Sequence, residues 1–588
     1  MAARSQQEEF AHAVSLGKED VWRRLLLDKS QDKRFPLDVD LCLLDAVRLQ
    51  SPAAVRDVLT LKPSLHAEDA EGQRAIHIAA RVGPAENVML LTQAGSTLSC
   101  MNAEGLSPLH IACQHDNLAT AQALILKGSN KNAARTNHML TPLHMAVMKG
   151  NKSVVELLLE NEADPNTKSS RSHGELTALA MAILKGDLSV MEALLSSGSH
   201  LEYTCDGRGS YPLHLAVESG SIDILNLLLA NLMQMTPPGR KAGFGTFLAW
   251  ARVNLSDDRQ PEDRAGMVML NLADHEGQTA LHLAIRRGQL HMVRLLLEAG
   301  VDVNIPFKDL LPLHLAIRCV QPRDSNLAEP LAMDCAERCR RVAEGAEWDD
   351  ALVKLLCEHC INVDSVTPSG QRPVHLALSA GLYSVALLLC SKAPDSSYVD
   401  CADASGTTPL HLACMHSKQG THSGSRPTQL QVIRKLLEMG ASVNARTNNR
   451  GSSPLSFAIL NDDLEVVSLL LDHRADLTAV DIDGMSALHD AVIAQSVAIM
   501  EALIAAGADV NLCDTNTGQT PLILAATEGG VAAAECLLNH GADLNYRESR
   551  MGFTALHRAI NNFCKSAPYL LFYRLLVKFK GRLLLVCY

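Results

Sequence analysis

The phrases TPLHMA at Thr141–Ala146 and TPLHLA at Thr408–Ala413 are two copies of one motif that recurs along a chain of 588 residues. With its divergent copies included, the motif starts at positions 8, 41, 74, 107, 141, 177, 211, 279, 311, 372, 408, 453, 486, 520 and 554. Most steps between starts are 32 to 36 residues, and the longer steps contain inserted segments. A period near 33 residues indicates a stacked array of helical repeats and not a conventional enzyme domain.

The copy that begins at Thr141 predicts the structure of one repeat. Thr141 is the expected N-cap of a first helix, and Pro142 suits the first helical position because its missing N–H breaks no helical bond. This helix is expected to end near Gly150, and a second helix should follow with an apolar face over residues 154–159. A β-turn that contains glycine then precedes the next copy.

This order of first helix, second helix and projecting hairpin, with TPLHxA at its head, resembles the ankyrin repeat over residues 8–580. The resemblance implies an all-α solenoid of stacked ankyrin helix-turn-helix repeats with projecting β-hairpin loops. It also implies that a concave surface of hairpins and first helices binds other proteins. The array is expected to be a monomer.

A histidine recurs at the fourth position of the motif. The resemblance implies that its imidazole bonds the backbone and the neighbouring repeat, so we do not interpret these residues as metal ligands. The ten are His77, His110, His144, His214, His282, His314, His375, His411, His489 and His557.

The match of each copy to the motif and the spacing of the copies predict how the chain is organised. Residues 1–73 are expected to be divergent N-terminal capping repeats, because the copies at 8 and 41 lack the TPL core. Segment 229–272 is either an insertion or a degenerate repeat centred on Thr246–Ala251. The remaining predicted parts are ankyrin repeats over 74–228 and 273–580, loop insertions at 321–349 and 416–429, and a C-terminal tail at 581–588.

Composition excludes several classes of protein. A net charge of −12 without a Lys/Arg-rich run argues against nucleic acid as a partner. No secretory signal and no apolar stretch of membrane-spanning length is visible, so we expect no direct membrane insertion. The 16 cysteines are scattered, which fits a reducing compartment. These features predict a cytoplasmic protein, with the nucleus as an alternative.

The motifs of common catalytic sites are absent. The sequence has no GxxxxGK[ST] phosphate loop, no GxSxG turn, no HExxH helix and no complete calcium loop, so we expect neither an enzyme nor a cofactor. The spacing of the cysteines matches no standard zinc finger and Cys357 falls on a repeat helix, so we expect no zinc site. The zinc candidates are Cys335, Cys339, Cys357, His359 and Cys360.

The residues at the hairpin tips are the candidates for protein contacts, although ordinary solvated turns would look the same in the sequence. They are Glu71, Glu104, Asp206, Glu276, Ser369, Ser405, Asp483, Thr517 and Arg550.

An asparagine recurs in the loop after many second helices, where we expect it to form local hydrogen bonds in the hairpin. The resemblance implies an alternative, in which an asparaginyl hydroxylase modifies these residues. They are Asn132, Asn166, Asn304, Asn444, Asn511 and Asn545.

Together these features predict a non-catalytic scaffold or adaptor that binds partner proteins. One alternative is the substrate-recognition subunit of a cullin-type ubiquitin ligase, although no SOCS box is visible in the closing residues 580–588 (KGRLLLVCY). Another is the cytoplasmic ankyrin portion of a membrane-associated protein.

Overall fold

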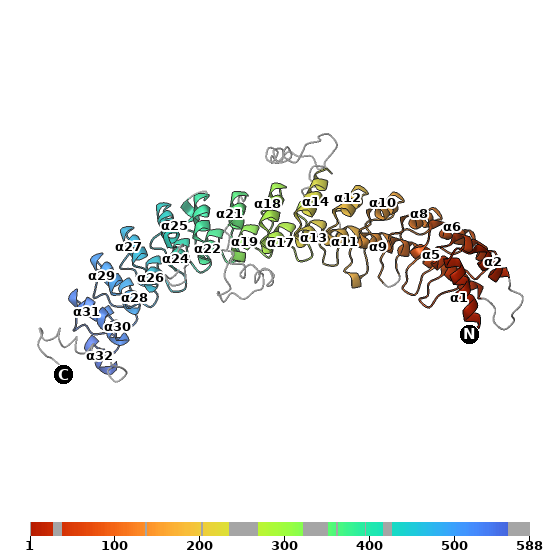
Figure 1. The fold of residues 1–588 in the computed structure, drawn as a ribbon. Coiled ribbons are helices and arrows are strands. Elements are labelled where there is room, and N and C mark those ends of the chain that lie inside the picture. The colour runs from red at the N-terminus through yellow and green to blue at the C-terminus, as the bar shows by residue number, and fades with distance from the viewer. Residues whose placement is uncertain are drawn as a thin grey trace. The chain divides into compact units, whose positions relative to one another are not determined.

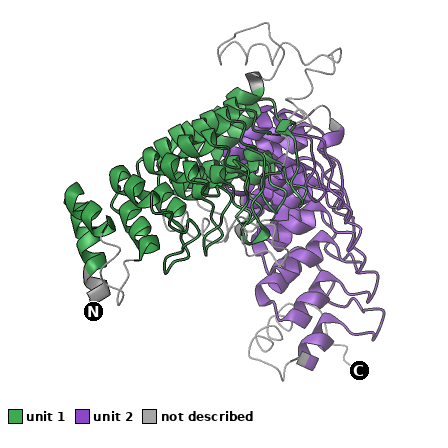
Figure 2. Cartoon of the chain, turned by 90° about the vertical axis from the view of Figure 1, so that its right-hand side faces the viewer, with its two compact units in different colours: residues 1–284, 289–302 green, residues 285–288, 303–588 purple. Residues whose placement is uncertain are grey.

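The computed structural model describes residues 2–27, 38–135, 138–201, 204–234, 269–320, 351–359, 363–393, 396–415 and 426–562 (Figure 1). The chain divides into two compact units, which Figure 2 colours separately. Unit 1 contains residues 1–284 and 289–302, and unit 2 contains residues 285–288 and 303–588.

Unit 1 is built from helix pairs in chain order. The first helices α5, α7, α9, α11 and α13 pack in one row and the second helices α6, α8, α10, α12 and α14 in another (Figure 1). The helices are α1 (Ala2–Ser15), α2 (Glu19–Leu27), α3 (Val39–Arg48), α4 (Pro52–Leu59), α5 (Ala75–Val82), α6 (Ala85–Gln93), α7 (Pro108–Gln114), α8 (Leu118–Leu126), α9 (Pro142–Lys149), α10 (Lys152–Glu160), η1 (Arg171–His173), α11 (Ala178–Lys185), α12 (Leu188–Ser196), α13 (Pro212–Ser219), α14 (Ile222–Gln234), α17 (Ala280–Arg286) and α18 (Leu290–Glu298).

Unit 2 repeats the same arrangement. Its first helices α22, α24, α26, α28, α30 and α32 contact each other in succession, as do the second helices α27, α29 and α31. The helices are α19 (Pro312–Val320), α21 (Ala351–His359), α22 (Pro373–Ser379), α23 (Tyr383–Ser391), η3 (Ser396–Tyr398), α24 (Pro409–Met415), α25 (Arg426–Glu438), α26 (Pro454–Leu460), α27 (Leu464–Asp472), α28 (Ala487–Ile493), α29 (Val497–Ala505), α30 (Pro521–Glu528), α31 (Val531–Asn539) and α32 (Ala555–Asn562).

The helix boundaries follow from the motif. The hydroxyl of Thr141 accepts a hydrogen bond from the His144 N–H, while His144 Nδ1 accepts one from the Thr141 N–H at 3.1 Å. Pro142 occupies the first turn, and Gly150 ends the helix with φ of 81°, a left-handed conformation that favours glycine. The predicted N-cap and C-cap are therefore confirmed.

The core is made of small and branched aliphatic side chains from adjacent repeats. Leu143 on α9 and Val154, Val155 and Leu158 on α10 are at most 1% exposed. Most repeat helices have only seven to nine residues, which is too short for stability in isolation, so packing between repeats must supply it. The prediction of an all-α solenoid is confirmed.

Five of the described projecting loops are closed by a single β-bridge. Among these bridges are Glu68↔Arg74, Ala273↔Thr279 and Val480↔Ser486, and the described residues contain no longer strand. These five hairpins are therefore tight turns whose two arms meet at one residue pair.

The divergent N-terminal copies fold as helix pairs. Phe10 on α1 and Trp22 on α2 are 0% and 2% exposed, and Trp22 Nε1 donates to Asp57 Oδ2 at 3.1 Å. Arg23 Nε donates to the same oxygen at 2.8 Å. These polar bonds join α2 to α4 where the motif residues are missing.

The described part of segment 229–272 belongs to repeats. Leu229 and Leu232 lie on α14 and are 1% and 4% exposed, and Leu270 is 7% exposed. Within unit 1, α14 contacts α18, and His214 Nε2 donates to the Gln278 carbonyl at 2.8 Å. The flanking repeats therefore contact each other directly, and the choice between an insertion and a degenerate repeat stays a prediction. The Thr246–Ala251 motif lies outside the described residues.

The predicted insertion at 416–429 can be compared with the structure in part. The insertion expected at 416–429 overlaps α25, where Gln429 is 1% exposed and its Nε2 donates to the Ala413 carbonyl at 2.9 Å. Helix α25 therefore begins at Arg426, before the predicted end of the insertion at 429. The insertion at 321–349 and the tail at 581–588 lie outside the described residues.

Asn87 occupies a position where a polar side chain has no visible advantage. It is 0% exposed on α6, and within the described structure neither its Oδ1 nor its Nδ2 has a hydrogen-bond partner. Asn87 is the third residue after the N-cap of α6. The equivalent residues are Thr120 in α8, Val154 in α10 and Val190 in α12, and all are 0% exposed. A valine therefore fits this site in two other repeats.

The substitution Asn87→Val is expected to raise the free energy of unfolding by about 1–3 kcal/mol, because it removes an unsatisfied buried amide. Urea unfolding followed by circular dichroism measures the change. The matched control is Thr120→Val, which should give no gain because it removes the bond from Thr120 Oγ1 to the Gly83 carbonyl at 3.2 Å. An Asn87→Val protein no more stable than wild type would contradict the expectation.

Candidate protein-interaction surface

Most of the described projecting loops are shaped by a polar side chain that bonds the backbone of the same turn. Asp69 Oδ1 accepts hydrogen bonds from the N–H groups of Glu71 at 2.9 Å and Gln73 at 2.8 Å. Between them Gly72 has φ of +68°, and a Cβ at this position would meet Ala103 at 2.9 Å. The same pair of bonds is made by Asn102, Asp206, Asp274, Asp403 and Asp481.

Backbone hydrogen bonds also join neighbouring loop tips. In unit 1, the Gly207 N–H donates to the Gly174 carbonyl at 2.8 Å. In unit 2, the Ala404 N–H donates to the Ser369 carbonyl at 3.0 Å and the Ser549 N–H to the Thr517 carbonyl at 3.2 Å. The turns are thus fixed internally and to each other, and each unit presents a preorganised strip of loops.

Most of the predicted contact residues are accessible on these loops. Glu71, Glu104, Glu276, Ser369, Asp483 and Arg550 are exposed, and Ser405 and Thr517 are half-buried. Asp206 differs, because it is 5% exposed and its carboxylate accepts from the N–H groups of Arg208 and Ser210. It organises the turn, and the neighbouring Arg208 is the residue that faces solvent there.

The histidines of the motif link consecutive repeats. His110 is 0% exposed, its Nδ1 accepts from the Ser107 N–H at 3.2 Å, and its Nε2 donates to the Leu140 carbonyl at 2.9 Å. Burial lowers its pKa to about 4, so the ring is neutral near pH 7. His77, His375, His411 and His489 also contact carbonyl oxygens of the next loop. These contacts confirm that motif histidines bond the backbone of the neighbouring repeat.

The asparagines bond between repeats as well as within them. Asn132 Oδ1 accepts from the Asp164 N–H at 3.0 Å, and Asn511 Oδ1 from the Asp543 N–H at 2.7 Å. Asn166 and Asn444 make the same bond to His200 and Asp476. These bonds between repeats add to the local hydrogen bonding that the sequence predicts. Asn132, Asn304, Asn444 and Asn545 are exposed, and Asn166 and Asn511 half-buried.

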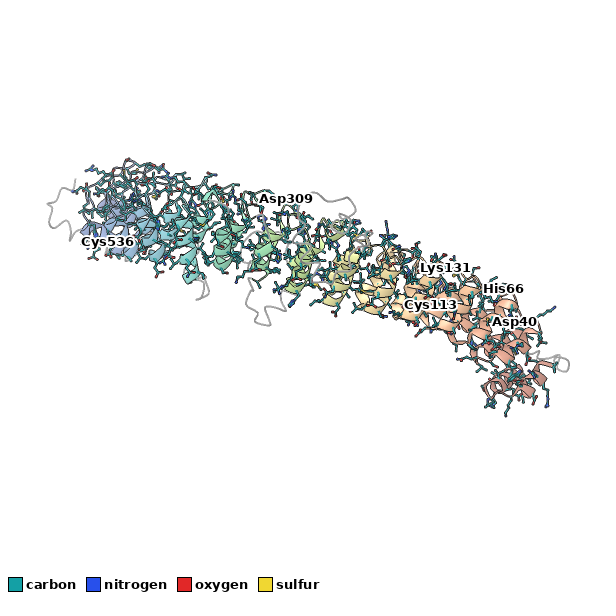
Figure 3. All side chains as sticks on the ribbon, turned by 90° about the horizontal axis from the view of Figure 1, so that it is seen from above. Asp40, His66, Cys113, Lys131, Asp309 and Cys536 are labelled. Atoms are coloured by element: carbon teal, nitrogen blue, oxygen red, sulfur yellow. The ribbon has the colours of Figure 1, made fainter. Side chains whose placement is uncertain are left out.

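Cysteine side chains fill the helical core. Cys113 on α7 is 0% exposed and Cys536 on α31 is 5% exposed, and burial raises the pKa of both thiols (Figure 3). Cys357 is buried on α21, whereas Cys335, Cys339 and Cys360 lie outside the described residues. In the part of the chain that the structure describes, no group of three or more His, Cys, Asp or Glu could hold a metal ion.

No helix among the described residues is long and apolar enough to cross a membrane.

A family model for ankyrin repeats in sets of three copies matches residues 43–135, 76–169, 143–237, 262–337, 342–446, 422–514 and 499–578. The chain therefore belongs to the ankyrin repeat family, and its array is a protein-interaction domain.

Three similar proteins illustrate how widely this domain is used. The human transient receptor potential cation channel subfamily A member 1 is 25% identical over 471 residues, covering 77% of this chain and 38% of the channel. The chicken nuclear factor NF-kappa-B p105 subunit is 33% identical over 208 residues, 34% of this chain and 20% of that protein. The Arabidopsis thaliana E3 ubiquitin-protein ligase KEG is 26% identical over 298 residues, 48% of this chain and 18% of the ligase. The chain thus spans less than two fifths of each of these relatives.

Proposed function

We propose that this protein is a non-catalytic scaffold that captures partner proteins on the surface formed by its projecting loops and first helices. The observation that carries the proposal is the strip of loop tips, in which most turns are fixed by a side chain of their own and several are bonded to a neighbouring loop. A surface that is already ordered loses little conformational entropy on binding. We further propose that the chain acts as a monomer in the cytoplasm, with the nucleus as an alternative.

Matched sets of substitutions test this proposal. The loop variant E71S/E104S/E276S changes three exposed glutamates on loop tips of unit 1. The control E86S/E156S/E192S changes three exposed glutamates on the second helices α6, α10 and α12. In quantitative affinity purification from cells, wild type and control should recover the same partners, and the loop variant several-fold less of at least one. Equal recovery by all three proteins would contradict the proposal.

Two narrower roles are each favoured by one comparison. The alignment to the cation channel covers 77% of this chain, which favours an ankyrin portion of a membrane-associated protein. The similarity to a ubiquitin ligase favours a substrate-recognition role. The same purification separates them, because cullin and elongin subunits would accompany a cullin-type ligase subunit and integral membrane proteins would accompany a membrane-associated chain.

We also propose that the loop asparagines are substrates of an asparaginyl hydroxylase. Asn132 and Asn545 are exposed on loops, as are Asn304 and Asn444, which serve as the test sites. Treatment of the purified chain with the enzyme should add the mass of one oxygen atom to peptides that contain either residue, and tandem mass spectrometry locates the addition. Unchanged peptide masses would remove this proposal.

A further inference from the structure

Four consecutive first helices in unit 1 have an Arg, His or Lys in their last turn or directly after it. Arg81 belongs to α5, His115 follows α7, and Lys149 and Lys185 are the last residues of α9 and α11. We call these four residues the basic row. Arg81 is the eighth residue of its copy of the motif, and the other three are the ninth residues of theirs. The repeat geometry therefore places His115, Lys149 and Lys185 at equivalent points of adjoining helices, with Arg81 one residue earlier.

Contacts show that the members of the basic row lie near each other. The first helices that carry them pack in succession, α5 on α7, α7 on α9 and α9 on α11. Lys185 Nζ donates to the Met148 carbonyl at 3.0 Å, so its side chain reaches across to the preceding repeat. Burial and then the charges of Arg81 and Lys149 lower the pKa of His115. His115 is therefore mainly neutral near pH 7, and Arg81, Lys149 and Lys185 carry the positive charge along this edge of unit 1.

Apolar side chains lie beside the two lysines. Met148 and Leu184 directly precede Lys149 and Lys185, and each is 52% exposed. The other apolar residues of α9 and α11 are mainly buried. Two neighbouring repeats thus each present a large apolar group next to an exposed ammonium group, on a chain whose net charge is −12.

The nearby carboxylates neutralise this surface only in part. Glu71 Oε2 lies 3.6 Å from Arg81 Nη1, and both side chains are partly exposed, so this ion pair is weak. Asp187 Oδ1 accepts from the Val190 N–H and the Ser189 hydroxyl at the start of α12. Its Oδ2 lies near Lys185 Nζ, because a Cβ on Gly150 would meet these two atoms at 2.7 and 2.5 Å. Lys149 is therefore the member of the basic row best able to receive a negative ligand, and Lys185 can do so in competition with Asp187.

We propose that the basic row, with Met148 and Leu184, binds an extended acidic segment of a partner protein that also carries apolar side chains. This proposal rests on the proposed scaffold function and names the chemistry of one partner. Packed helices are about 10 Å apart and an extended chain advances about 3.3 Å per residue, so acidic residues about three positions apart match successive repeats. A polynucleotide fits less well, because its phosphates are much closer together than successive repeats are. In addition, the apolar side chains of Met148 and Leu184 cannot form hydrogen bonds to phosphates.

A designed peptide tests the pairing of charge and spacing. The probe is a fluorescein-labelled peptide of four Glu-Leu-Ser triplets, and its binding to the purified full chain is followed by fluorescence anisotropy. The variant K149E/K185E should bind it at least about tenfold more weakly, because two attractions become repulsions. The variant M148S/L184S should also weaken binding while leaving every charge in place.

The matched control is K62E/K127E, which reverses two exposed lysines of unit 1 that lie outside the basic row. It makes the same change in net charge and should leave peptide affinity unchanged. A peptide with lysine in place of glutamate should not bind wild type. Thermal unfolding checks that all variants fold.

Equal affinity of wild type and K149E/K185E would overturn the proposal. So would an oligonucleotide of equal charge that binds the basic row more tightly than the peptide, because the ligand would then be a polyanion and not a protein segment. The scaffold function is tested separately by its loop variants. If they lose partners while the peptide fails to bind, the scaffold function stands and this inference fails.

Discussion

Acidification from pH 7 to pH 5 is expected to destabilise unit 1 by about 2 kcal/mol for each buried motif histidine whose pKa is near 4. His110 and His144 both belong to this class, and burial is the main cause for each. In the unfolded chain these rings protonate near pH 6.5. The unfolded state therefore binds more protons, so stability that is present above pH 6.5 is lost as the pH falls toward 4.

The substitution His110→Ala isolates this effect. It should lower stability at pH 7, because the bond from Nε2 to the Leu140 carbonyl is lost. The further loss between pH 7 and pH 5 should then be about 2 kcal/mol smaller than in wild type. Urea unfolding at both pH values measures the difference. An identical decline in both proteins would contradict the assignment of a neutral, buried imidazole.

The carboxyl group of Asp490 in unit 2 has the opposite effect on stability as the pH falls. Burial raises the pKa of Asp490 to about 7, against a lowering hydrogen bond from Ser456. The folded state then binds the extra proton, and protonation of this group stabilises unit 2 as the pH falls below 7. The acid sensitivity of unit 1 is therefore expected to be the clearer of the two.

The substitution Arg558→Met is expected to reduce the stability of the last described repeats by about 3–5 kcal/mol. The Glu548 side chain is 0% exposed and lies against the Arg558 guanidinium, with donor–acceptor distances of 2.7, 2.8 and 3.2 Å. Gln519 Nε2 donates to the same carboxylate at 3.0 Å. Without the arginine, a buried carboxylate would keep only this neutral donor.

The double variant E548Q/R558M is the control, because it removes both charges together. It should recover most of the lost stability, since the cost arises from an unpaired charge and not from the loss of the pair itself. Hydrogen exchange of the amides in α30, α31 and α32 measures the effect locally, which suits a repeat array that need not unfold as one unit. Equal protection in wild type and R558M would contradict this interpretation.

Much of the fold could be predicted from the sequence because stacking is encoded by the same residues in every repeat. Thr141 and Gly150 behave as the caps that their positions indicated, and His110 bonds to the next loop. Boundaries were harder to predict where the motif fades. Leu229 and Gln429 belong to repeat helices because they are buried against neighbours that a linear pattern does not reveal.

The candidate surface was less predictable, because its residues are defined by relations between repeats. Asp206 resembled an exposed tip in the sequence, but its carboxylate bonds the turn from inside. The cross-repeat bond of Asn132 depends on where the next loop lies. The basic row could have been found by aligning the copies of the motif, which brings Lys149 and Lys185 to one position.

The most direct test of the central claim is cross-linking of the intact chain to a partner recovered from cells, followed by mass spectrometry. Lysine cross-links are expected from Lys149 and Lys185, at the ends of first helices. Lys127 and Lys152, on or next to the second helices α8 and α10, should give few. Cross-links concentrated on Lys127 and Lys152, with none from Lys149 or Lys185, would contradict it.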